Sequence, residues 1–109
     1  MQHITISGTL LDDAEKCTDK DGRNYIRFSV SCGDSTPGGR TEFTHYNCTC
    51  YIMAYEGMRK GDQVFITGRF SPRLRKDDKG RSYMNLNIMV HQINGGRKAA
   101  DKQKDNGSD

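Results

Sequence analysis

The sequence predicts a small all-β domain, and three observations carry that prediction. Apolar and polar residues alternate over five separate segments, which is the pattern of half-buried strands rather than of helices. Glycine, proline and aspartate cluster between those segments, as they do at turns. The 109 residues suffice for one domain, but only 33% are hydrophobic, so the core must be thin. A thin core favours either a compact barrel or an oligomer.

Two strands are expected in the first third of the chain. Alternation over residues 3–10 predicts a first strand that ends at Gly8, and the second strand spans residues 25–32. Residues 11–22 between them are polar and charged, so we expect a loop or a short irregular link there. Alternation places the following side chains on the apolar faces of the two strands: Ile4, Ile6, Ile26, Phe28, Val30 and Cys32.

The third strand, residues 43–52, carries information on both of its faces. A flexible loop at residues 33–40 precedes it, and residues 53–59 after it can form a helical turn or two. The face that we expect in the core holds Tyr46, Cys48, Cys50 and Ile52. The opposite face holds Phe43, His45, Asn47, Thr49 and Tyr51.

A long hairpin joins the fourth and fifth strands and concentrates the positive charge. The fourth strand follows Lys60-Gly61 and bends or bulges at Gly68, and the fifth spans residues 83–93. Between residues 69 and 82, six Lys or Arg stand against two Asp, a net of +4, whereas the whole chain carries +3. The local charge points to a polyanionic ligand.

No apolar pattern continues after residue 94. We therefore expect a folded domain at residues 1–94 and a disordered polar tail at residues 95–109. No signal peptide is visible, and no apolar run is long enough to cross a bilayer. The expected location is the cytoplasm, where the four cysteines stay reduced.

Five strands, with the one helical segment between the third and the fourth, are the order of an OB-fold. That fold is a five-stranded, partly open Greek-key barrel whose outer face and loops bind oligonucleotides or oligosaccharides. The predicted architecture is an all-β OB-fold barrel with a long basic hairpin between its last two strands. Another kind of small β-barrel remains an alternative at this point.

Several segments, in their order and spacing, resemble the bacterial single-stranded DNA-binding protein family. They are residues 4–10, residues 26–30, Asn47-Cys48, residues 59–70 and Tyr83. The resemblance covers residues 3–93. It implies an OB-fold that binds single-stranded DNA without sequence preference and without catalysis. It also implies a homo-oligomer, usually a tetramer, which can work with replication or recombination proteins.

The chain departs from that family in its aromatic residues and at its end. Residues 31–39 contain no aromatic where the family stacks a base, and Arg75 stands where its long hairpin has an aromatic. His45 and Tyr51 stand at two further stacking positions. The family's acidic tail with an apolar tip, which recruits partner enzymes, has no match at residues 106–109. Two explanations stay open: the sequence is cut short of that tail, or the chain is a divergent member of the family, for example from a phage or mobile element.

A sequence-blind binder of single strands needs flat groups for the bases and cations for the phosphates. Aromatic side chains on one strand face can each stack a base, and an arginine can stack while it pairs with phosphate. The candidate nucleic-acid-binding residues are Arg27, Phe43, His45, Asn47, Tyr51, Arg69, Arg73, Arg75, Lys76, Lys79 and Arg81. The expected partner is single-stranded DNA, and no membrane contact is expected.

Other chemistries have little support in the sequence. Cys48-x-Cys50 lacks the Cys-x-x-Cys spacing of a zinc site, so we expect no metal and interpret the cysteines as small buried hydrophobes. No phosphate loop, His-Glu-x-x-His or serine elbow is found, so we expect neither an enzyme nor a cofactor. Two alternatives stay open. One is a primosomal or conjugation accessory protein that acts mainly through protein contacts, and the other is a structural OB subunit.

Overall fold

The structure, a computed structural model, describes residues 1–95, and the expected polar tail from residue 96 onward lies outside them. Six strands and one short 3-10 helix follow one another within these described residues. They are β1 Gln2–Leu10, β2 Glu15–Thr18, β3 Asn24–Ser35, β4 Thr41–Cys50, η1 Met53–Tyr55, β5 Gln63–Lys76 and β6 Ser82–Gly95. The all-β class and the helical turn after the third expected strand are confirmed.

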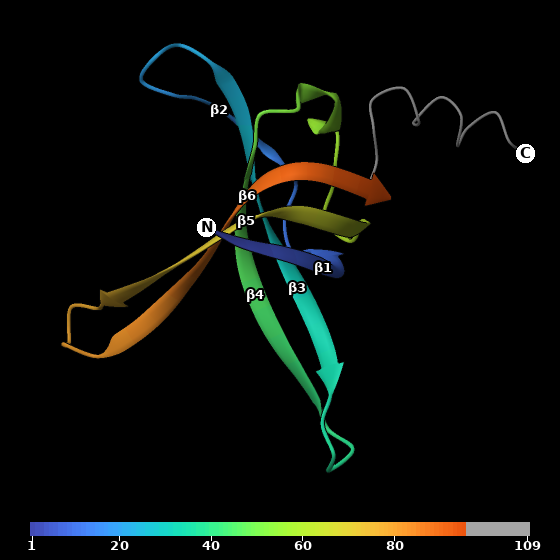
Figure 1. The fold of residues 1–109 in the computed structure, drawn as a ribbon, viewed down its shortest axis with the longest axis vertical. Coiled ribbons are helices and arrows are strands. Elements are labelled where there is room, and N and C mark those ends of the chain that lie inside the picture. Colours follow the sequence, from blue (N-terminus) through green and yellow to red (C-terminus); the bar gives the residue numbers. More distant parts are fainter. Residues whose placement is uncertain (96–109) are drawn as a thin grey trace, which may run out of the picture.

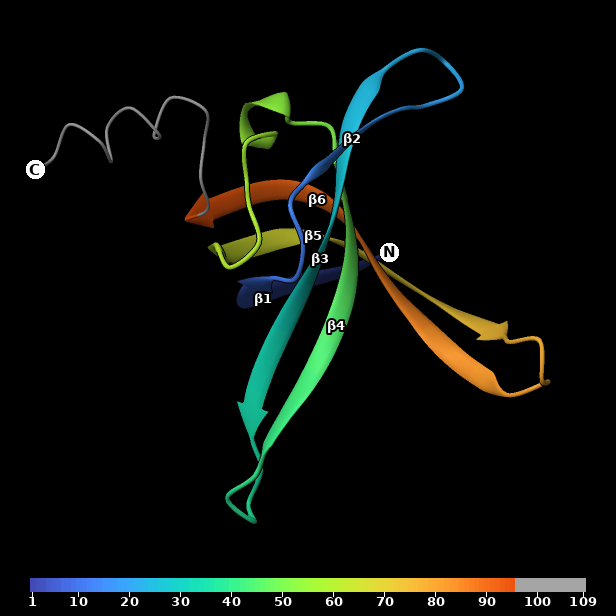
Figure 2. The ribbon, with the colours of Figure 1, turned by 180° about the vertical axis from the view of Figure 1, so that it is seen from behind.

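The strands form one sheet that closes on itself. Their order is β1-β5-β6-β4-β3-β2, and β1 also pairs with β3 at Thr9↔Ser31 and Leu10↔Val30. All pairs are antiparallel except β4–β6. Three hairpins, β2–β3, β3–β4 and β5–β6, project from this barrel in different directions (Figures 1 and 2). The expected Greek-key barrel is confirmed.

The core lies inside the barrel and follows the alternation seen in the sequence. Each of the five barrel strands contributes side chains that are less than a tenth exposed, and Tyr55 of η1 and Met58 after it add two more. The other core residues are Ile6, Leu10, Ile26, Phe28, Val30, Cys32, Cys48, Cys50, Val64, Ile66, Ile88, Val90 and Ile93. Most of these positions were expected from period-two alternation alone.

The expectation that the first strand ends at Gly8 is wrong. β1 continues to Leu10, and Gly8 is the point where β1 crosses close over β3. A Cβ at this position would collide with the Ser31 carbonyl oxygen and the Val30 side chain. The glycine therefore permits barrel closure instead of ending the strand.

The expectation of a loop over residues 11–22 is also wrong, because β2 occupies Glu15–Thr18. β1 and β2 lie one after the other along the same edge of β3, and Cys17 pairs with Tyr25. β2 lies beyond the closed barrel, so no core covers either of its faces. Without a buried face there is no apolar alternation to reveal the strand.

A β-bulge interrupts the β5–β6 ladder close to the predicted position. The register shifts between Thr67 and Gly68, and the extra residue is His91 on β6. Because of this extra residue Val90 and Ile93 both point into the core, although they are three positions apart. The expected bend at Gly68 is confirmed. Within residues 1–95, no helix is long and apolar enough to cross a membrane.

Candidate nucleic-acid interface

Register places the outward side chains of four neighbouring strands on one surface. Directly paired residues of adjacent strands point to the same side of a sheet. Arg27 of β3 pairs with Thr49 of β4, and Asn47 of β4 pairs with Asn87 of β6. β5 continues this side through residues paired with β6. This surface, called the polar face below, comprises Arg27, Ser29, Asn47, Thr49, Arg69, Ser71, Arg73, Arg75, Tyr83, Asn85, Asn87 and Met89.

A hollow of about 440 Å³ lies in the middle of the polar face. Arg27 and three asparagines, Asn47, Asn85 and Asn87, line it, and the Asn87 side chain donates to the Ser71 carbonyl at 3.2 Å. Acidic residues form part of its rim: Asp12, Asp13 and Glu15. The centre of the face thus offers amides and one guanidinium, while Phe28, the one aromatic residue that lines the hollow, is buried. Sequence reasoning named Asn47 but missed Asn85 and Asn87, although their alternation in the fifth strand was visible.

The β5–β6 hairpin extends the polar face beyond the barrel (Figure 1). Three arginines of β5 point to that face, because even numbers of positions separate them: Arg69, Arg73 and Arg75. Lys76 lies on the opposite side, so the structure does not bring it to the polar face. Lys79 and Arg81 stand at the tip of the hairpin.

The side of the hairpin that carries Lys76 is apolar and largely uncovered. Leu74 is 66% exposed and its cross-strand partner Met84 is 54% exposed. The neighbouring pair, Pro72 and Leu86, is half-buried. This side, called the apolar hairpin face below, consists of Pro72, Leu74, Met84 and Leu86. The hairpin therefore presents three arginines to one side, and hydrophobic side chains together with Lys76 to the other.

Phe43 and His45 lie in the N-terminal half of β4, on the β3–β4 hairpin, which projects from the barrel in a different direction from the β5–β6 hairpin (Figure 1). The Phe43 ring lies against Gly33 of β3, whose missing side chain makes room for it. Phe43 is 65% exposed and borders a second hollow, of about 620 Å³, near the open edge of β1. His45 is exposed opposite Ser31. Phe43 and Tyr51 are eight positions apart, which is about 26 Å along an extended chain.

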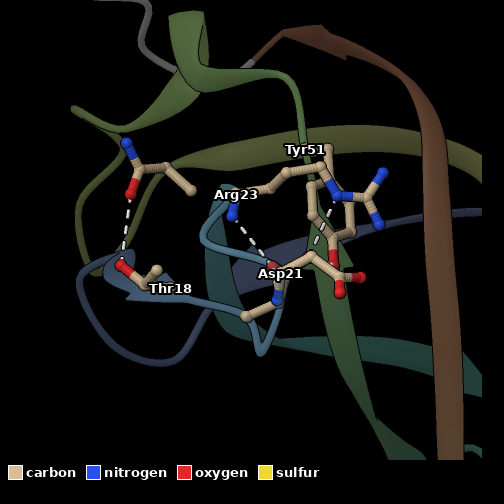
Figure 3. Close-up of polar contacts among 6 residues, drawn as sticks. Thr18, Asp21, Arg23 and Tyr51 are labelled. Atoms are coloured by element: carbon tan, nitrogen blue, oxygen red, sulfur yellow. Dashed lines mark hydrogen bonds and ion pairs between the residues drawn. The ribbon is translucent and has the colours of Figure 1, made fainter.

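Tyr51 does not lie in the strand, contrary to expectation, because β4 ends at Cys50. Its hydroxyl donates to Oδ2 of Asp19 at 3.0 Å, and its ring lies 5.3 Å from the Tyr25 ring. The Arg23 guanidinium carbon lies over the Tyr51 ring, 5.1 Å from its centre. Figure 3 shows Arg23 reaching across Tyr51 from the β2–β3 turn that also carries Asp21. We call Asp19, Arg23, Tyr25 and Tyr51 the tyrosine cluster.

The tyrosine cluster is held in place by both packing and charge. Partial burial, and then the hydrogen bond to the Asp19 carboxylate, raise the pKa of Tyr51 above its usual value. Backbone hydrogen bonds, with that of Arg23 first, lower the pKa of Asp19. The Tyr51 ring therefore remains neutral beside a carboxylate that remains ionised at neutral pH. Sequence reasoning named Tyr51 alone and missed its three partners.

The inward face of β4 is as expected up to Cys50. Tyr46 is half-buried, packs on the core and meets the Phe70 ring edge-to-face at 6.3 Å. Burial raises the pKa of the Cys48 thiol to about 12, so this thiol acts as a small apolar side chain. Ile52 was expected in the core but is 37% exposed. Strand alternation no longer applies to it, because it follows the end of β4 and precedes η1.

Comparison with known proteins agrees with this geometry. The model of the single-strand binding protein family matches residues 1–95. The solved structure of the mitochondrial single-stranded DNA-binding protein Rim1 of S. cerevisiae has a TM-score of 0.60 at 22% identity, and the match covers 86% of this chain and 93% of Rim1. The Plasmodium falciparum SSB complex with single-stranded DNA has a TM-score of 0.63 at 14% identity, covering 89% of this chain and 91% of that one. No curated protein sequence matches this chain.

The two solved structures show the shared OB-fold, and the family model covers nearly all of the sequence. The predicted fold class and the resemblance drawn from residues 3–93 are both confirmed. This chain belongs to the single-strand binding protein family and binds single-stranded DNA.

Proposed function

We propose that this protein holds single-stranded DNA on its polar face without regard to base sequence and without catalysis. The observation that carries the proposal is the row of Arg69, Arg73 and Arg75, which continues a polar sheet face out along a projecting hairpin. Cations in a row can neutralise successive phosphates, and phosphates are the same in every sequence. The role is protection of single strands in replication, recombination or repair. Its place is the cytoplasm, where the four free cysteines would stay reduced.

The proposed contacts divide into three groups along the polar face. Arg69, Arg73 and Arg75 would pair with phosphates, with Lys79 and Arg81 at the hairpin tip. Arg27 and Asn47 in the central hollow would hydrogen-bond to nucleotides passing over it. Aromatic platforms stand at the two ends of β4, with Phe43 and His45 at one end and Tyr51 at the other. This distribution suits a strand that crosses the face rather than one bound at a single point.

A second candidate function, contact with replication or recombination proteins, is favoured by the apolar hairpin face. Leu74 and Met84 are both more than half exposed and lie side by side on one surface. Exposed apolar patches on otherwise polar surfaces often mark protein contacts. An accessory protein that works through protein contacts would use this face, while the opposite face of the same hairpin binds DNA.

We also propose that the protein is a homo-oligomer that forms along β1. β1 pairs with β5 over Gln2↔Phe70 to Thr9↔Gln63 but meets β3 only at its last two residues. In the described chain, the other edge of residues 2–8 therefore has no neighbouring strand. Unpaired strand edges are templates for pairing with a second chain. Phe65, 53% exposed, lies beside this edge.

Titration with a fluorescent oligo-dT at several salt concentrations tests the DNA-binding proposal. We expect binding that weakens steeply with salt and is indifferent to base sequence. The double variant Arg73→Ala with Arg75→Ala should reduce the slope of log K against log salt by roughly 1.4, at about 0.7 for each lost phosphate contact. Salt-insensitive binding, or equal competition by a duplex of the same length, would contradict the proposal.

Lys76→Ala is the matched control for this experiment. Lys76 directly follows Arg75 but points to the apolar hairpin face. We therefore expect its removal to leave the salt slope nearly unchanged. If Lys76→Ala reduced the salt slope by about 0.7, as we expect for each of the two arginines, the charge of the hairpin would matter regardless of the face on which it lies.

A further inference from the structure

The tips of the β2–β3 and β5–β6 hairpins are the same turn. Residues 19–23 read DKDGR and residues 77–81 read DDKGR, so Asp opens each turn, Gly stands fourth and Arg fifth. In both turns the Asp amide donates to the Arg carbonyl at 2.9 Å, and the Gly amide donates to the Asp carbonyl at 3.0 Å. The glycines, Gly22 and Gly80, have φ values of 85° and 78°. The two backbones are therefore closed in the same way.

The side chains repeat as closely as the backbones. Oδ1 of Asp19 accepts from the amides of Asp21 and Arg23, each at 2.9 Å. Oδ1 of Asp77 accepts from the third and fifth residues of its own turn, also at 2.9 Å. Oδ2 then accepts from Nε of the arginine, at 3.2 Å in the first turn and 3.0 Å in the second. Each aspartate thus fixes a turn and an arginine at once.

This arrangement shelters the negative charge and displays the positive one. The Asp19 and Asp77 side chains are 15% and 33% exposed, whereas Arg23 and Arg81 are 69% and 73% exposed. The ion pair engages Nε, and within residues 1–95 the terminal nitrogens of both arginines meet no carboxylate. Backbone hydrogen bonds lower the pKa of both aspartates, which keeps the anchors charged at neutral pH. A guanidinium fixed in this way keeps two terminal nitrogens for a phosphate.

We propose that Arg23 is a phosphate-binding residue for single-stranded DNA, positioned by Asp19 at the tip of the β2–β3 hairpin, as Asp77 positions Arg81 at the tip of the β5–β6 hairpin. The proposal rests on the proposed function, because Arg23 would add one more phosphate contact for DNA that is already bound to the polar face. It adds Arg23 and Asp19, which the candidate residues from sequence did not include.

The surroundings of Arg23 favour a nucleotide over a free anion. Its guanidinium lies over the Tyr51 ring, and the Tyr25 ring adjoins that ring. Tyr25 precedes Arg27 by two positions on β3, and Arg23 stands just before that strand in the β2–β3 turn, so both lead directly onto the polar face. A nucleotide offers both a phosphate for the terminal nitrogens and a flat base for the stacked groups, whereas inorganic phosphate offers only the first.

The direction in which Asp19→Asn changes the affinity for DNA tells whether Asp19 positions Arg23 or acts only through its charge. Asp19→Asn removes a negative charge near the DNA, so electrostatics alone predicts tighter binding. If Asp19 positions Arg23, binding should weaken instead, by roughly 3- to 10-fold at 50 mM salt, because the guanidinium loses its anchor. Arg23→Ala should weaken binding at least as much and reduce the salt slope by about 0.7.

Asp21→Asn is the matched control, since it removes the same charge from the same turn. Asp21 contributes its backbone amide, and not its carboxylate, to the hydrogen bonds of the turn. We expect this variant to bind oligo-dT as tightly as the unaltered chain or more tightly. Thermal unfolding of each variant checks that the domain remains folded, and Arg23→Ala, which keeps the Asp19 turn, tests the site if Asp19→Asn does not fold.

The outcomes distinguish this proposal from the broader one. If the unaltered chain fails to bind oligo-dT, the proposed function fails and this inference fails with it. If the chain binds with a steep salt slope but Arg23→Ala changes neither slope nor affinity, only this inference is overturned. Asp19→Asn binding as tightly as Asp21→Asn would also overturn the positioning role. NMR of the Arg23 Nε–H group should show a shift with oligo-dT that equimolar inorganic phosphate does not produce, and the reverse would assign the tip to free phosphate.

Discussion

At the scale of single residues, Tyr51 and Tyr46 stand in opposite environments on β4 and just beyond it. Tyr51 is 38% exposed and joined to the β2–β3 turn, whereas Tyr46 packs between the core and Phe70. An exposed ring held by neighbours is a platform for a base, and a half-buried ring is part of the packing. The two residues should therefore fail in different ways when they are removed.

Tyr51→Ala should cost about 1–3 kcal/mol of binding to oligo-dT, the usual worth of one stacked base. The chain contains no tryptophan, so tyrosine emission reports binding directly. Oligo-dT should quench part of that emission, and much of the quench should vanish in the variant. Binding and quenching equal to those of the unaltered chain would remove Tyr51 from the interface.

Tyr46→Ala is the counterpart and should lower stability by about 1–3 kcal/mol, less than a fully buried aromatic because Tyr46 is only half-buried. Its affinity for DNA should stay nearly unchanged, since its ring faces the core side. Chemical denaturation measures the first effect and oligo-dT titration the second. If Tyr46→Ala lost affinity for DNA and kept its stability, Tyr46 would point towards the DNA and not towards the core.

Residue identity alone could predict the core but only part of the candidate site. Burial of Ile26, Phe28 and Val30 followed from alternation, because a barrel strand has one covered face. Arg23 gave no such signal, since its place beside Tyr51 depends on a contact between the β2–β3 turn and the end of β4. The repeated Asp-x-x-Gly-Arg pentapeptide was the available clue, and it is visible only when the two turns are compared.

At the scale of elements, strands with one buried face were predictable and strands without one were not. β2 escaped prediction because it lies outside the barrel. The shift in the β5–β6 ladder was half predictable, since Gly68 marks the bend but nothing in the sequence assigns the extra residue to His91. Only the pairing of two distant strands decides which one carries the additional residue.

Gly68→Ala should destabilise the domain by roughly 1–3 kcal/mol through overpacking at the bulge. A Cβ at this position would collide with the Met89 carbonyl oxygen and press on the Ile88 side chain at 2.9 Å. Backbone atoms cannot move aside as a flexible side chain can. Thermal or chemical denaturation of the variant measures the loss.

Gly38→Ala is the control for this prediction. Gly38 lies in the β3–β4 loop, where the nearest atom to an added Cβ would be 4.0 Å away. Its substitution should leave stability unchanged or slightly raised, because alanine restricts the unfolded chain. Equal losses at both positions would mean that the effect of Gly68→Ala is not due to the close approach of β6.

At the scale of the whole molecule, barrel closure decides where a second copy can attach. Only Thr9 and Leu10 join β1 to β3, so most of β1 keeps an open edge. The sequence alone could not show where the barrel closes, because closure depends on pairing between strands that are distant in the sequence. The apolar hairpin face is also exposed, so self-association could take place either at the open edge of β1 or at this face.

Two substitutions of equally exposed residues separate these sites. Phe65 is 53% exposed beside the β1 edge, and Met84 is 54% exposed on the apolar hairpin face. We expect the unaltered protein to scatter light as a multiple of 12.3 kDa at tens of micromolar. Phe65→Lys should shift it towards 12.3 kDa, because a charge would have to be buried beside the paired β1 strands, whereas Met84→Lys should leave the oligomer intact. The opposite pattern would assign self-association to the hairpin, and a single 12.3 kDa species before any substitution would remove the oligomer altogether.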